Sequence, residues 1–171
     1  VVQIAKHIVG LTLRYGVECN ILDFNGTLDL PDYVLCNLDY VIASIHPQNL
    51  KSACEADVMR AYIGAMQNPY VSFIGHPDDD RYPVNYEVFV HNCLENQCIP
   101  ELNEASLISG SYRKGGYKNA KCLLQNCIKY SCPVLVSSDS HGKDGIGEGP
   151  NCEELLSELD FPAELIFNKL I

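Results

Sequence analysis

Two chemical kinds of side chain, imidazoles and carboxylates, stand where short apolar runs of this sequence stop. Glu18 closes one run, His46 and His76 close the next two, and Asp139 and His141 close a later one. The intervals are 28 residues from Glu18 to His46, 30 to His76 and 63 to Asp139, which is the length of one or two strand–helix units. Mixed imidazole and carboxylate ligands suit zinc, manganese or iron better than magnesium or calcium. The pattern therefore predicts a metal centre assembled from separate strand ends.

Each of these residues alone has a simpler explanation. A histidine after a strand is usually a hydrogen-bonded turn residue, Glu18 could be a solvated strand residue, and Asp139 and Ser140 are both good helix N-caps. The metal interpretation depends on four strand ends that recur with the period of a βα unit. His7 and His91 fall in segments with helical character, so we expect them to be surface or packing residues.

The elements that must position these residues alternate between two periodicities. Short runs rich in Val and Ile predict strands, and apolar residues at helical spacing predict helices between them. The predicted strands are 13–20, 40–45, 71–74, 99–103, 134–138 and, more weakly, 165–167. The predicted helices lie within 51–68, 83–97, 116–131 and 151–160. This alternation predicts an α/β fold of parallel βαβ units, whose strand ends meet at one mouth. Composition does not decide between an open sheet and a barrel.

Length and composition exclude several classes of protein. The chain has 171 residues, 47% of them hydrophobic and 20% charged, which is typical of one folded domain. A net charge of −10 argues against a long nucleic acid as partner, and no apolar run approaches the roughly 20 residues of a membrane span. Nine cysteines without metal-knuckle spacing predict mostly reduced, buried thiols and a cytoplasmic protein.

Five segments, in this order and spacing, resemble the polymerase-and-histidinol-phosphatase (PHP) domain family, in particular its small bacterial phosphatase-like members. The segments are GVECNI, VIASIHPQN, FIGHPDDDRY, ELNEAS and VSSDSHG. The resemblance implies a distorted (β/α)7 TIM-like barrel whose mouth holds up to three divalent metal ions and hydrolyses phosphoesters. Zinc is the first expectation for the metal, with manganese and iron as alternatives. The expected substrate is a small phosphorylated molecule.

The resemblance also assigns metal-binding roles to particular residues. Glu18 matches the carboxylate that bridges two metal ions, and His46 and His76 match the imidazoles that complete one of those two sites. Asp139 matches a carboxylate of the other site. His141 matches one ligand of a third.

Three residues are the predicted catalytic residues: Asp139, His141 and Arg113. We expect Arg113 to meet the substrate phosphate, with a solvated loop as the alternative. Asn103 could orient a ligand or the phosphate at the same mouth. The three aspartates at 78–80 are expected to be solvated or to lie just behind the metal ligands.

The sequence departs from the family pattern at its beginning. The family's His-x-His strand end and two further histidines have no match, and the first residues suggest the end of a helix running into a strand. Residues 1–171 are therefore expected to form the C-terminal portion of a single PHP domain, without its first two strands. We expect the open edges to pair with the missing segment or with a second copy of the chain.

Two other functions stay open at this point. A chain without the His-x-His strand could be a non-catalytic PHP-like module with a structural or regulatory role. An amidohydrolase-like metal hydrolase also gathers His and Asp at barrel strand ends. Such enzymes usually bridge their metals with a lysine, and no strand end here carries one, so a phosphoester substrate is favoured.

Overall fold

A parallel β-sheet forms the centre of the protein. The computed structural model describes residues 7–8 and 11–169. The sheet has five strands in the order β3-β4-β5-β6-β7, so each strand pairs with the next one along the chain. The strands are β3 (Gly16–Asn20), β4 (Tyr40–Ser44), β5 (Phe73–Ile74), β6 (Ile99–Asn103) and β7 (Leu135–Ser137).

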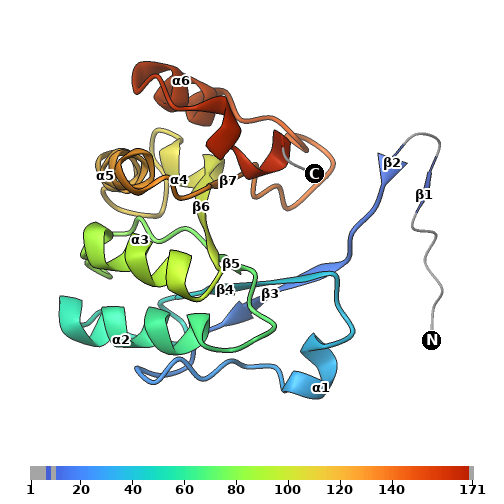
Figure 1. Cartoon of the computed structure of the whole chain (residues 1–171), viewed down its shortest axis with the longest axis vertical. Helices are drawn as coiled ribbons and strands as arrows, with labels where there is room; N and C mark the ends of the chain where they lie inside the picture. The colour runs from blue at the N-terminus through green and yellow to red at the C-terminus, as the bar shows by residue number, and fades with distance from the viewer. Residues whose placement is uncertain (1–6, 9–10, 170–171) are drawn as a thin grey trace.

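Helices follow the strands and cover the sheet on one side. Figure 1 shows α2, α3 and α5 side by side along that face, with α6 beyond them, and the antiparallel hairpin β1–β2 (His7–Ile8 and Leu11–Thr12) projecting on the opposite side. The α-helices are α1 (Asp32–Leu35), α2 (Glu55–Met66), α3 (Tyr86–Glu95), α4 (Glu104–Leu107), α5 (Gly116–Tyr130) and α6 (Pro150–Glu158). Two short 3-10 helices, η1 (Ala163–Leu165) and η2 (Phe167–Lys169), end the described chain.

The core lies between the sheet and these helices. Ile74 and Leu102 of the sheet are fully buried, as are Phe89 of α3 and Leu123 of α5. The Phe89 ring meets the ring of Tyr62 edge-on, with centroids 5.4 Å apart, and so fixes α3 against α2. This packing holds the strands rigidly, and with them the residues at the strand ends.

The α/β class and the parallel βαβ organisation are confirmed, and the closed barrel of the PHP type stays a prediction. All nine cysteines are free thiols and six of them are buried, as expected. Among the described residues, no helix combines the length and the apolar character that a membrane crossing requires.

Two local predictions are wrong. The segment 165–167 forms no strand; it spans the end of η1 and the start of η2, and only Ile166 makes a single bridge to Val134. Pro162 directly precedes η1, and its fixed φ favours a tight helical turn over a paired strand. His7 lies in β1 rather than in a helix. Most of the helix expected before residue 13 falls outside the described residues.

A glycine in α2 tests how closely that helix packs on the loop after β3. A Cβ added at Gly64 would lie 2.0 Å from the backbone oxygen of Asn25. Helix propensity alone predicts that Gly64→Ala stabilises the protein by about 1 kcal/mol. We expect the opposite, a loss of about 1–3 kcal/mol in the free energy of unfolding, because the backbone at Asn25 or in α2 must move to make room for the methyl group.

Urea unfolding monitored by circular dichroism measures this difference. Gln125→Ala, at an exposed position of α5, is the control and should change the free energy of unfolding by less than about 0.5 kcal/mol. A Gly64→Ala variant as stable as the parent protein would mean that α2 does not pack this tightly.

Candidate metal centre

The parallel sheet brings the predicted metal ligands to one edge. His46, His76 and Asp139 each stand two residues beyond the end of their strand, after β4, β5 and β7. Glu18 lies inside β3, next to Cys19, which is fully buried on the opposite side of the strand. The alternation of a strand therefore turns Glu18 away from the core and toward the mouth.

Glu18, His46 and His76 converge into one cluster. The Glu18 Oε1 atom lies 3.0 Å from His76 Nε2 and 3.4 Å from His46 Nε2. One potential ligand atom from each of the three residues lies within 4.8 Å of the others. One carboxylate and two imidazoles at this separation are the donor set of a zinc, manganese or iron site, so the residues fit a divalent metal ion.

Hydrogen bonds prepare the cluster for a cation. The His46 Nδ1 atom lies 2.8 Å from the amide oxygen of Asn20, which can only accept, so Nδ1 carries a proton and Nε2 is the ring nitrogen that faces Glu18. Hydrogen bonds from His46 and His76 hold the pKa of Glu18 far below its usual range, although partial burial opposes this. Glu18 is therefore an ionised carboxylate, the form that binds metal.

A second group of residues lies around Asp139. Its Oδ2 atom accepts hydrogen bonds from Arg113 Nη2 at 3.2 Å and from Asn103 Nδ2 at 3.1 Å. Arg113 is only 10% exposed and also donates to Asn103 Oδ1 and Ser106 Oγ, so it is a fixed residue rather than part of a solvated loop. The predicted third-site ligand His141 is 89% exposed, with Nε2 3.3 Å from Asp139 Oδ1.

The two groups border the same space. A cavity of about 340 Å³ is lined by Glu18 on one side and by Asp139 on the other, with Glu101 and Asn103 between them. The structure thus brings together five of the six predicted site residues at one mouth, directly or through this cavity. His141 is connected to the group through Asp139 and otherwise faces outward.

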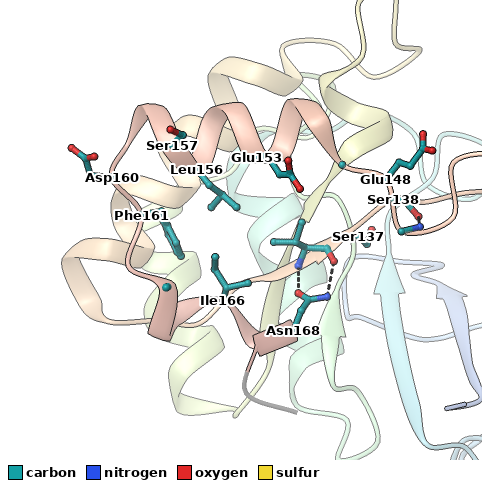
Figure 2. A pocket seen from close by; sticks show the side chains of 14 residues that line it. Ser137, Ser138, Glu148, Glu153, Leu156, Ser157, Asp160, Phe161, Ile166 and Asn168 are labelled. Carbon is teal, nitrogen blue, oxygen red and sulfur yellow. Dashed lines mark hydrogen bonds between the residues drawn. The ribbon is translucent and has the colours of Figure 1, made fainter. Parts of the chain in front are cut away.

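A larger cavity of about 580 Å³ adjoins the first one along β7, and the two share Val136, Ser137, Ser138 and Gly147. Figure 2 shows it beneath α6, with Leu156, Phe161 and Ile166 forming an apolar wall. Asn168 also lines the cavity. Its side-chain amide accepts a hydrogen bond from the backbone N–H of Val136 at 2.8 Å and donates one to the backbone oxygen of Val136 at 2.9 Å. Space is therefore available next to the candidate metal centre.

Sequence reasoning missed part of this site. Asp78 and Asp79 are buried, 1% and 7% exposed, so they are not solvated as one of the two expectations had them. Asp79 pairs with Arg81, whereas Asp78 accepts one hydrogen bond from Ser106 at 3.0 Å. Glu101 was visible only as a polar residue on a strand. The side chain of Glu101 is only 5% exposed, and this burial, which marks it as part of the site, cannot be deduced from the sequence.

Comparison with curated proteins finds relatives along almost the whole chain. It is 37% identical over 163 residues to a probable phosphatase of Clostridium botulinum, a match that covers 95% of this chain and 66% of that protein. It is 36% identical over 166 residues to a probable phosphatase of Clostridium acetobutylicum, covering 97% and 67% of the two chains. A probable phosphatase of Caldicellulosiruptor bescii is 36% identical over 168 residues, with 98% and 69% covered. The chain belongs to this family of probable phosphatases.

The chain spans about two thirds of the length of these probable phosphatases. No family model matches it. The cluster of Glu18, His46 and His76 fits a metal-dependent member of a phosphatase family.

The buried carboxyl group of Asp78 leads to a prediction about pH. Burial raises its pKa from 3.8 to about 6, although the hydrogen bond from Ser106 opposes this. Because the folded state then binds the proton more tightly than the unfolded state, the contribution of Asp78 to stability falls as the pH rises from about 4 to about 6. Asp78→Asn removes this penalty and should stabilise the protein at pH 8 by up to about 3 kcal/mol, with a smaller gain at pH 4.

Chemical unfolding at both pH values, in the presence of chelator, checks this expectation. Asp80→Asn changes the exposed neighbouring aspartate and should show no such pH-dependent gain. Equal destabilisation by Asp78→Asn at pH 4 and pH 8 would contradict the account of a buried, proton-binding carboxyl group.

Proposed function

We propose that this chain carries the metal-binding site of a PHP-type phosphoesterase, which hydrolyses small phosphate monoesters with metal-activated water. The observation that carries the proposal is the convergence of Glu18 from β3 with His46 and His76, which follow the carboxyl ends of β4 and β5 in the same parallel sheet. The relatives' printed name, probable phosphatase, supports a phosphorylated substrate.

The charges around the cavity favour a metal-dependent mechanism. Glu18, Glu101 and Asp139 all line it, and a phosphate monoester is itself an anion. Entry of such a substrate is electrostatically unfavourable unless cations neutralise the carboxylates. Arg113 supplies one positive charge through its ion pair with Asp139. Divalent metal ions would supply the further positive charge that the other carboxylates require.

Glu18, His46 and His76 would hold the first ion, zinc in the first instance, with manganese or iron as alternatives. A bound ion of this kind lowers the pKa of a coordinated water and polarises a phosphoryl oxygen. Asp139 would hold a second ion together with Glu18, and His141 would contribute to a third. These roles follow the resemblance to the PHP family, and Glu18 and Asp139 line the same cavity.

Arg113 is the proposed phosphate-binding residue. Asn103 and Ser106 hold one side of its guanidinium group, which leaves little freedom of orientation. A planar guanidinium group fixed in this way can bind two phosphate oxygens at once and stabilise the charge of the transferring phosphoryl group.

We propose a PHP-type barrel for the domain, since consecutive parallel strands pair in sequence order in such a barrel. A cytoplasmic location and pairing of the open edges with a second copy or a further segment stay predictions.

Hydrolysis assays on the zinc- or manganese-loaded protein test the proposal. We expect p-nitrophenyl phosphate to be hydrolysed, p-nitroacetanilide to be left intact, and chelator to abolish the reaction. His76→Ala should remove bound metal and lower the rate more than ~100-fold, since even the outer partners of metal ligands are worth 10–100-fold.

His91→Ala is the matched control, because His91 is exposed on α3 and its ring contacts Tyr130. It should keep both metal and activity. Metal binding without hydrolysis of any phosphate ester would favour a non-catalytic module, and hydrolysis of the anilide would favour an amidohydrolase-like enzyme. Full metal content in His76→Ala would overturn the site assignment.

A further inference from the structure

The backbone of His76 adopts a conformation that needs support. Its φ angle is +29°, in a region that residues with side chains rarely occupy, and Pro77 follows it directly. Such a conformation costs of the order of 1–3 kcal/mol and persists only where neighbouring groups enforce it. The imidazole of His76 is in contact with Glu18 in this conformation, so whatever enforces it also places a metal ligand.

The sheet itself cannot provide that support. The pairing of β5 with β6 ends at Ile74, opposite Pro100, and proline has no N–H to continue the ladder. On the other side, the last ladder bond goes from the Gly75 N–H to the Ala43 oxygen. His76 is the first residue beyond both.

The side chain of Glu101, the residue after Pro100, continues the pairing in place of the backbone. Its Oε2 atom accepts the backbone N–H of His76 at 2.7 Å, and its Oε1 atom accepts the hydroxyl of Ser137 at 2.5 Å. The amide of Asn103 donates to Oε2 at 3.1 Å. With three donors around a carboxylate that is 5% exposed, the group is fixed by charge-assisted hydrogen bonds.

We infer that Glu101 is a positioning residue for His76: its carboxylate, clamped between β5, β6 and β7, holds the backbone of a metal ligand in the conformation that metal binding requires. The metal-binding part of this inference rests on the proposed function. The same carboxylate connects the two halves of the site, because Asn103 donates both to Glu101 and to Asp139. No assignment of Glu101 as a ligand is needed, since its oxygens already accept three hydrogen bonds.

Two substitutions separate positioning from mere bulk. Glu101→Met keeps the approximate length of the side chain and removes the acceptor, which leaves the buried His76 N–H without a partner. Glu101→Gln keeps one acceptor oxygen for His76 and Asn103, while its NH2 group can donate to the Ser137 hydroxyl oxygen. We therefore expect Glu101→Gln to rescue most of what Glu101→Met loses.

Glu104 is the matched control. It is also 5% exposed, lies three residues further along the chain, and accepts backbone N–H groups, those of Asn151 at 3.2 Å and Cys152 at 2.9 Å. It ties α4 to α6 instead of supporting a metal ligand. Glu104→Met should therefore lower the stability of the protein without changing its affinity for zinc.

The experiment measures zinc affinity by competition with a chromophoric chelator, and the amide resonance of His76 by NMR in the metal-free protein. In Glu101→Met we expect the His76 amide proton to move upfield and zinc affinity to fall by about 10–100-fold. Glu101→Gln should lie close to the parent protein on both measures. Glu104→Met should have the zinc affinity and the His76 amide resonance of the parent protein. If Glu101→Met does not fold, Glu101→Asp replaces it, since its carboxylate is one methylene further from His76.

Unchanged zinc affinity and an unmoved His76 amide in Glu101→Met would overturn the inference. So would an equal loss of affinity in Glu104→Met, which would show a general effect of stability. Loss of one bound zinc ion per chain, in place of weaker binding, would make Glu101 a ligand and also overturn it. If the parent protein binds no zinc or manganese, the proposed function fails, and the His76 amide in the metal-free variants still decides whether Glu101 holds that backbone.

Discussion

The in-register parallel pairing of β3, β4 and β5 brings the candidate metal ligands to one edge of the sheet. Parallel strands all end at the same edge of a sheet, so residues 28 or 30 positions apart in the chain meet there. Antiparallel pairing of any one of these strands would carry its candidate ligand toward the opposite edge. The helices packed on the sheet, and aromatic contacts such as that of Tyr62 with Phe89, keep this alignment rigid.

The same edge concentrates negative charge in a chain that is already acidic overall. Buried or half-buried carboxylates are stable only where donors or cations meet them. Each carboxylate of the site has such partners. Glu18 contacts two imidazoles, Asp139 pairs with Arg113, and Glu101 accepts hydrogen bonds from three donors. An arrangement that gathers carboxylates around a cavity is costly for a mere scaffold and useful for a site that binds metal ions and then a phosphate.

How far the sequence predicts this structure depends on whether a feature arises from periodicity or from tertiary contact. The bounds of β6 were predicted correctly, and parallel strands account for Glu18, His46 and His76 coming to the same edge of the sheet. For Asp78 the sequence left open whether the side chain is solvated or lies behind the metal ligands, because the residues that bury it come from distant segments. The role of Glu101 depends on donors that arrive from β5 and β7, and no local pattern records them. The four-residue helices α1 and α4 were too short to show a helical period.

Two imidazoles and a carboxylate, rather than any of the nine cysteine thiols, are the proposed ligands of a divalent metal ion. X-ray absorption spectroscopy at the zinc edge of the zinc-loaded protein tests this most directly. We expect nitrogen and oxygen neighbours at about 2.0–2.1 Å, with the multiple-scattering pattern of imidazole. Sulfur neighbours at about 2.3 Å, or a spectrum without imidazole, would contradict it.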